Sequence, residues 1–78
     1  MNEKLKRLFE VWKRKNGEDF YLFSFTWINQ QRWQIAKKNR TVSLAEIFCA
    51  PEIVDGVDLN RSYNKAQIIF TLQQALGL

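Results

Sequence analysis

The residue types that carry most catalytic and metal chemistry are nearly missing from this chain. It has no histidine and a single cysteine, Cys49, so His/Cys zinc sets and the Ser-His-Asp and Cys-His arrangements are excluded. Its eight carboxylates fall in expected helix faces, caps and turns, where solvated structural roles suffice. Its three glycines are scattered and form no phosphate-binding loop. We therefore expect a non-enzymatic protein with neither a metal nor a cofactor.

Positive charge is concentrated in the first half of the chain. Residues 1–40 contain ten Lys/Arg and four Asp/Glu, a net charge of +6, whereas residues 41–78 contain two and four, a net charge of −2. Helix-spaced pairs Glu3–Arg7 and Glu10–Arg14 leave the other cations of this half unpaired. A basic surface of this kind can contact phosphates, and its alternative is an ordinary solvated surface. The candidate nucleic-acid contacts are Lys4, Lys6, Lys13, Lys15, Lys37, Lys38 and Arg40.

An aromatic run at residues 20–28 reads as a strand, because it is rich in aromatic and β-branched side chains. Successive strand residues point to opposite sides, so Tyr21, Phe23, Phe25 and Trp27 share one face. Since the other face is also largely apolar, we expect this strand to be central in its sheet. The row is either core, the commoner role of large aromatics, or a surface that binds a protein or stacks unpaired bases.

A second candidate surface lies on the expected C-terminal helix. Tyr63, Gln67, Phe70 and Gln74 recur at i, i+4, i+7 and i+11, which places them on one stripe. The core stripe is separate and consists of Ile68, Ile69, Leu72, Ala75 and Leu76. The first stripe therefore predicts a docking site for a partner or a second copy. Its alternative is that Phe70 covers the edge of the sheet.

The remaining elements follow from periodicity and turn residues. Residues 2–15 form a helix, with Leu5, Leu8, Phe9 and Trp12 on its buried stripe. After a turn at residues 29–31, residues 32–38 form a second strand, with a helix as the competing interpretation. A capping box at residues 43–46 starts a short helix over residues 44–49. Asp55-Gly56 turns a small hairpin, and the last helix runs from a cap at Asn60 or Ser62 to Leu76.

These elements predict one α+β domain spanning residues 1–78, with two long helices on one face of an antiparallel sheet of two or three strands. The order is loosely similar to that of double-stranded RNA-binding domains. Such domains carry a basic cluster where their last helix begins, and here that cluster is reduced to Arg61 and Lys65, with Asp55 and Asp58 nearby.

The chain shows neither a signal peptide nor an apolar run of about 20 residues, and its one cysteine suits a reducing compartment. We therefore expect a soluble cytoplasmic protein. Its most plausible function is protein docking through aromatic surface that the core does not need, as a regulator, inhibitor or assembly factor, for example of a phage or another mobile element. Nucleic-acid binding through the basic residues is the alternative, and self-association is compatible with either.

Overall fold

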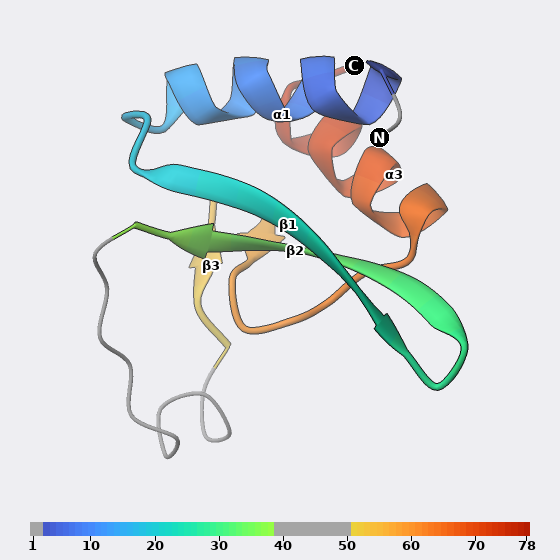
Figure 1. The fold of residues 1–78 in the computed structure, drawn as a ribbon. Coiled ribbons are helices and arrows are strands. Elements are labelled where there is room, and N and C mark those ends of the chain that lie inside the picture. The colour runs from blue at the N-terminus through green and yellow to red at the C-terminus, as the bar shows by residue number, and fades with distance from the viewer. Residues whose placement is uncertain (1–2, 39–50) are drawn as a thin grey trace.

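The computed structural model describes residues 3–38 and 51–78 of the chain, and these adopt an α+β fold (Figure 1). Figure 1 shows both helices on the same side of the main sheet, which confirms the expected fold class. The short helix expected over residues 44–49, together with Arg40 and Cys49, lies outside the described residues. The elements are α1 (Glu3–Lys15), β1 (Phe20–Trp27), β2 (Gln30–Lys37), β3 (Ile53–Val54), β4 (Val57–Asp58) and α3 (Lys65–Ala75).

The first helix buries the stripe that its sequence predicts. Leu5, Leu8, Phe9 and Trp12 are the buried residues of α1, and the ring of Trp12 meets that of Phe20 edge-on at 4.9 Å. One cluster joins these side chains to the rest of the core. Its other members are Trp33, Ile35, Val57, Leu59, Tyr63, Ile68 and Leu72. The helices and both β-hairpins thus pack around a shared apolar centre.

The main sheet is an antiparallel hairpin whose register runs from Phe20 opposite Lys37 to Trp27 opposite Gln30. Ile28 and Asn29 form a two-residue turn with positive φ angles of 49° and 60°, the twist that suits tight hairpins. The second strand is therefore confirmed, and the helix alternative for residues 32–38 is wrong. The turn lies at residues 28–29, earlier than the expected 29–31, so β1 ends at Trp27 and β2 begins at Gln30.

The expectation that β1 is central in its sheet is wrong. Among the described residues β1 pairs only with β2, and the far edge of β2 is bridged by Tyr63. The Trp33 amide donates to the Tyr63 carbonyl at 2.8 Å, and the Tyr63 amide donates back at 2.7 Å. Within the described part of the chain, β1 is therefore an edge strand of a two-stranded sheet.

The small β3–β4 hairpin confirms the turn predicted at Asp55-Gly56, where both φ angles are positive, at 46° and 81°. The Asp55 carboxylate accepts hydrogen bonds from Lys15 Nζ at 3.0 Å and from Asn16 Nδ2 at 3.2 Å. Lys15 also donates to the carbonyl of Ala75 at 3.0 Å. The turn is thus joined to the C-terminal ends of both α1 and α3.

The cap of the last helix is Asn64, and the expected caps Asn60 and Ser62 are wrong. Asn64 and Gln67 form a reciprocal capping box, with amide-to-side-chain distances of 2.8 Å and 3.2 Å. The helix starts late because the preceding segment runs beside β2, held by the Tyr63 bridge. Its core stripe is confirmed: Ile68 and Leu72 are buried, and Ile69, Ala75 and Leu76 pack against the cluster.

Candidate functional site

The aromatic row of β1 lies on the face of the sheet that the helices leave uncovered. The opposite face is buried through Phe20, Trp33 and Ile35, and alternate residues of a strand point to opposite sides. The row at Tyr21, Phe23, Phe25 and Trp27 therefore faces away from the helices. The core interpretation of this row is wrong, because among the described residues none of its four side chains belongs to the hydrophobic cluster or packs against it.

Exposure increases toward the two ends of the row. Tyr21 is 45% exposed and Trp27 is 64% exposed, while Phe23 and Phe25 are half-buried. Neighbouring rings contact one another, with centroids 5.7 Å apart for Tyr21–Phe23 and 5.9 Å apart for Phe23–Phe25. We call these four residues the outer aromatic face. Ile28, in the adjoining turn, is 77% exposed.

The polar side chains that flank this face are fixed in place. Arg32, opposite Phe25 in the register, donates from Nε to the Ser62 hydroxyl at 3.1 Å and from Nη2 to the Ser62 carbonyl at 2.8 Å. Gln34 Nε2 donates to the carbonyl of Leu59 at 2.9 Å. These bonds hold β2 to the segment before α3. They leave the aromatic rings as the freely available groups on this side of β1.

The stripe predicted on the C-terminal helix is only half correct. Tyr63 is buried at 5% exposure and precedes α3, where its hydroxyl accepts a hydrogen bond from the Asp58 amide at 3.2 Å. Gln67 is exposed but is used in the helix cap. Phe70, 61% exposed, and Gln74 do share a surface. The error came from extending helical periodicity back through residues that run alongside β2.

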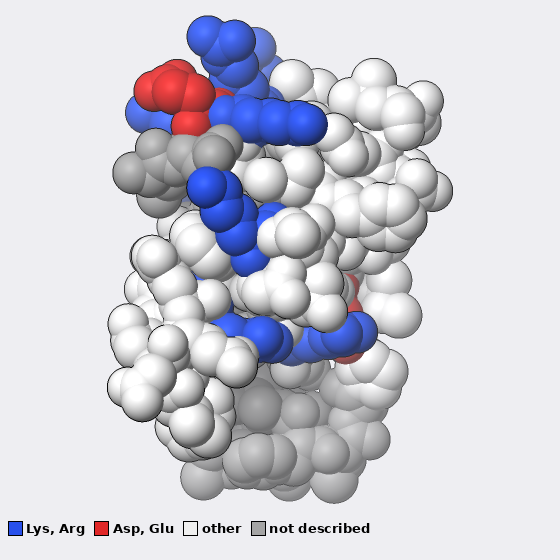
Figure 2. Space-filling model, turned by 90° about the vertical axis from the view of Figure 1, so that its right-hand side faces the viewer, with Lys and Arg blue, Asp and Glu red and all other residues white. Residues whose placement is uncertain are grey.

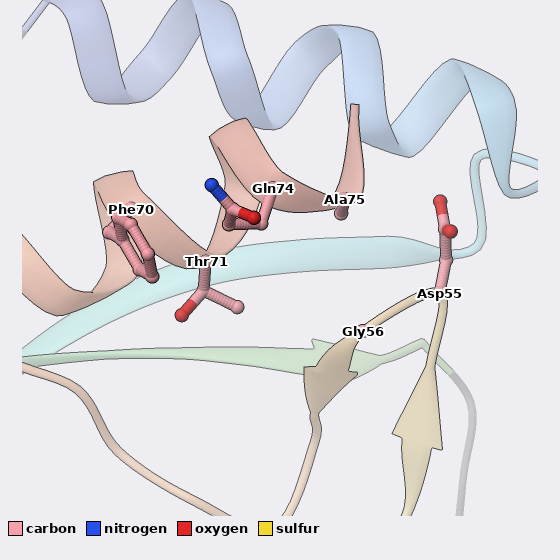
Figure 3. A pocket seen from close by; sticks show the side chains of 6 residues that line it. All are labelled: Asp55, Gly56, Phe70, Thr71, Gln74 and Ala75. Atoms are coloured by element: carbon pink, nitrogen blue, oxygen red, sulfur yellow. The ribbon is translucent and has the colours of Figure 1, made fainter. Parts of the chain in front are cut away.

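Phe70 and Gln74 line an open pocket of about 460 Å³ beside the β3–β4 turn (Figure 3). In Figure 3 the α3 residues face Asp55 and Gly56 across it. Hydrogen bonds from Asn16 and Lys15 lower the pKa of Asp55, so its carboxylate is ionised and already has partners. The pocket therefore offers a phenyl ring, a threonine hydroxyl and an amide, a set too sparse to fix a charged ligand.

The basic residues do not form the single unpaired set that the sequence suggested. Lys15 pairs with Asp55. Lys13 pairs with Glu10 at 3.3 Å and lies 5.8 Å over the ring of Phe9, so the expected Glu10–Arg14 pair is replaced by a closer one. The lysines Lys4 and Lys37 are exposed on α1 and at the end of β2.

Three lysines do converge on one groove. Lys6, Lys13 and Lys38 border a groove of about 260 Å³ between α1 and the start of β1, and Tyr21 lines it as well. Elsewhere the charge is dispersed. Figure 2 shows the right-hand face of Figure 1 with its Lys and Arg side chains in separate groups and uncharged side chains between them. That face therefore has no continuous basic track.

Within residues 3–38 and 51–78, no three Cys, Asp or Glu side chains gather where they could hold a metal ion. No helix in the same described part of the chain is long and apolar enough to cross a membrane. Comparisons with protein-family models, with curated protein sequences and with solved structures found no significant match. The outer aromatic face is therefore assessed on its physical chemistry alone.

Proposed function

We propose that this protein is a small, non-enzymatic, cytoplasmic binding module that docks onto another protein through its outer aromatic face. The observation that carries this proposal is the exposure of Tyr21 and Trp27 on one side of one hairpin. Contiguous exposed apolar surface is uncommon on soluble proteins and tends to mark interfaces. Tyr, Trp and Phe are also the side chains most enriched where binding energy is concentrated.

The hairpin is suited to binding because little of it needs to become ordered. Phe23 lies between the rings of Tyr21 and Phe25, and the β1–β2 register is continuous along both strands. A pre-ordered surface loses less side-chain entropy on association than a mobile one. At about 25 cal/mol per Å² of apolar area removed from water, covering two or three such rings contributes several kcal/mol to the free energy of binding.

This mode of action supports a role as a regulator, inhibitor or assembly factor, the activities open to a chain that acts by contact alone. An accessory protein of a phage or another mobile element fits the small size. The pocket beside Phe70 is the competing docking surface. It presents one exposed ring, whereas the outer aromatic face presents a contiguous row.

Site-specific photo-cross-linking tests the proposal. A photoreactive phenylalanine analogue is placed at Trp27 in one variant and at Phe70 in a matched control, since the two side chains are similarly exposed at 64% and 61%. In extract of the source cells, we expect a discrete cross-linked protein from position 27 and none from position 70. Cross-linking from position 70 alone would contradict the proposal.

The captured partner then gives a quantitative test. Because truncating a central aromatic anchor costs about 2 kcal/mol or more, Trp27→Ala should weaken partner affinity by about 30-fold. Phe70→Ala should leave the affinity unchanged. Arg32 shares this face, opposite Phe25, but its guanidinium already donates to Ser62, so the affinity should respond little to salt.

Nucleic-acid binding is the second candidate, and the convergence of Lys6, Lys13 and Lys38 beside Tyr21 favours it. Phosphate contacts would make the affinity fall steeply with salt, while Tyr21 could stack a base. A titration with mixed-sequence RNA and DNA tests this candidate. Charge reversal at Lys38 should abolish binding, and charge reversal at Lys4, on the exposed side of α1, should have a smaller effect.

A further inference from the structure

Among the described residues, the backbone of β1 has one unpaired hydrogen-bonding edge, and the register fixes which residues face it. Residues joined by paired backbone bonds alternate along an antiparallel ladder. The two-residue turn makes Trp27 opposite Gln30 the closing bonded pair, so Tyr21, Phe23 and Phe25 bond toward β2. The amides and carbonyls of Phe20, Leu22, Ser24 and Thr26 therefore point away from β2.

Two sets of backbone hydrogen bonds agree with this alternation. Lys38 donates its amide to the Asp19 carbonyl at 2.7 Å, which continues the odd-numbered bonding series of β1. Trp33, opposite Ser24 in the register, directs its own backbone groups outward to Tyr63. In the part of the chain that the structure describes, no strand occupies the outward side of β1.

This edge lacks the devices that usually protect an edge strand. Natural proteins shield such strands with charged side chains, proline, bulges or very short length. β1 has eight residues, FYLFSFTW, with no charge and no proline, and its pairing with β2 runs without a bulge. In a chain that is 26% charged, an uncharged edge of this length invites addition of another strand.

We propose that the occupant of this edge is β1 of a second copy, paired antiparallel so that the two hairpins form one four-stranded sheet. A two-fold axis at Phe23 lets all four outward-facing residues bond, with Phe20 opposite Thr26 and Leu22 opposite Ser24 of the second copy. Each of them then donates and accepts one backbone hydrogen bond. The two aromatic rows become neighbours, with Phe23 against Phe23 and Tyr21 against Phe25.

Charge favours a second copy in this orientation. Glu18 and Asp19 precede β1, while the turn after it carries no charge. Antiparallel pairing therefore places Asp19 beside Trp27 of the other copy and keeps the two acidic ends apart. A self-complementary surface of this kind closes as a symmetric dimer and does not propagate. The remaining repulsion comes from Lys6, Lys13 and Lys38, which border the groove along the start of β1.

The inference concerns the edge of β1, whereas the proposed function concerns its outer face. The two can therefore fail separately. Ser24 is exposed and lies on the face opposite the aromatic row, so a substitution there changes the edge and leaves the outer aromatic face intact. Its amide bonds outward, so a proline at this position removes no bond of the β1–β2 ladder.

Sedimentation equilibrium of the full chain over a concentration series tests the pairing. We expect a dimer at about twice the monomer mass of 9.3 kDa, with association that strengthens as salt screens the lysines. Ser24→Pro should weaken association by about 100-fold, because backbone bonds across the two-fold axis are lost. Ser24→Thr, which keeps the amide and the strand preference, is the matched control.

Circular dichroism and a cooperative thermal transition establish whether each variant is folded. If Ser24→Pro does not fold, Ser24→Lys replaces it, since this change keeps the amide and places a charge beside the axis in each copy. A mass of 9.3 kDa at every concentration and salt would overturn the inference. So would a folded Ser24→Pro or Ser24→Lys variant that associates as tightly as the parent protein.

Discussion

The Asp55 carboxylate joins the β3–β4 turn to the C-terminal end of α1, and replacing it with asparagine isolates the contribution of its charge. Asn has nearly the same shape and tolerates the positive φ angle of 46° at this position. Asp55→Asn therefore keeps the β3–β4 turn while removing the ion pair with Lys15, whose Nζ lies 3.0 Å from the carboxylate.

The expected loss is modest because Lys15 is half exposed, at 51% of its side chain. An exposed ion pair contributes about 0.2–1 kcal/mol. The Asn16 hydrogen bond also loses its charge assistance, which costs about 0.5 kcal/mol more. The free energy of unfolding should therefore fall by about 1 kcal/mol at neutral pH, and Tm should fall by about 4–8 °C.

The pH dependence of this loss gives the sharper test. The pKa of Asp55 is lowered below 3.8 in the folded protein, first by Asn16 and then by Lys15. A lowered folded-state pKa stabilises the protein above the unfolded-state value, and that stabilisation disappears as the pH falls through the folded-state pKa. The difference between Asp55→Asn and the parent protein should thus be full at pH 7 and shrink as the pH drops below 3.8.

Urea unfolding of both proteins at several pH values measures the difference directly. Lys15→Met serves as a second arm, and the double variant should lose less than the sum of the two single losses. A destabilisation of the same size at neutral and acidic pH would refute the electrostatic explanation. A strictly additive double variant would refute the Lys15–Asp55 coupling.

Three further substitutions test the packing and the capping of α3. Asn64→Ala removes the cap and should lower the free energy of unfolding by about 1 kcal/mol; equal urea midpoints would contradict the cap. Tyr63→Phe leaves the partly buried Asp58 amide without this acceptor and should cost about 1 kcal/mol; an unchanged thermal transition would show that the bond contributes nothing. Leu72→Ala empties a fully buried site and should cost about 2–5 kcal/mol by urea unfolding, whereas a loss below 1 kcal/mol would contradict its place in the core.

The parts of the fold that follow from local periodicity could be predicted. The spacing of Leu5, Leu8, Phe9 and Trp12 identified α1 and its buried stripe, because an amphipathic helix has one apolar side. The Asp55-Gly56 turn could also be predicted from the sequence, since few residue pairs other than Asp-Gly tolerate two successive positive φ angles. The core stripe of α3 at Ile68 and Leu72 followed in the same way.

The exposed side of β1 could not be predicted, because apolar side chains occupy both of its faces. Period-two alternation separates a buried face from a solvated one only when the two differ in polarity. In β1 the choice is made by helices distant in sequence, which cover Phe20 and leave Trp27 exposed. Composition pointed instead to a central strand.

Tertiary contacts also decided the ends of α3 and the partners of the lysines. The Trp33–Tyr63 bridge holds the chain extended until Asn64. The residues around Tyr63 contain no local pattern that predicts pairing with a strand thirty residues earlier. Lys15 was expected to be unpaired. Its partner Asp55 lies forty residues away in the sequence, and only the packing of the β3–β4 turn brings the two side chains together. Candidate sites that depend on such long-range pairs are the ones sequence periodicity misplaces.

Acrylamide quenching of tryptophan fluorescence tests most directly whether the outer aromatic face is the docking surface. Trp12 and Trp33 are buried at 0% and 7% exposure, whereas Trp27 is 64% exposed, so Trp27→Phe identifies the quenchable signal. We predict that this signal is accessible in the free protein and becomes protected when the partner cross-linked from position 27 is added. A Trp27 signal that resists quenching in the free protein, or stays fully accessible in the complex, would contradict the account.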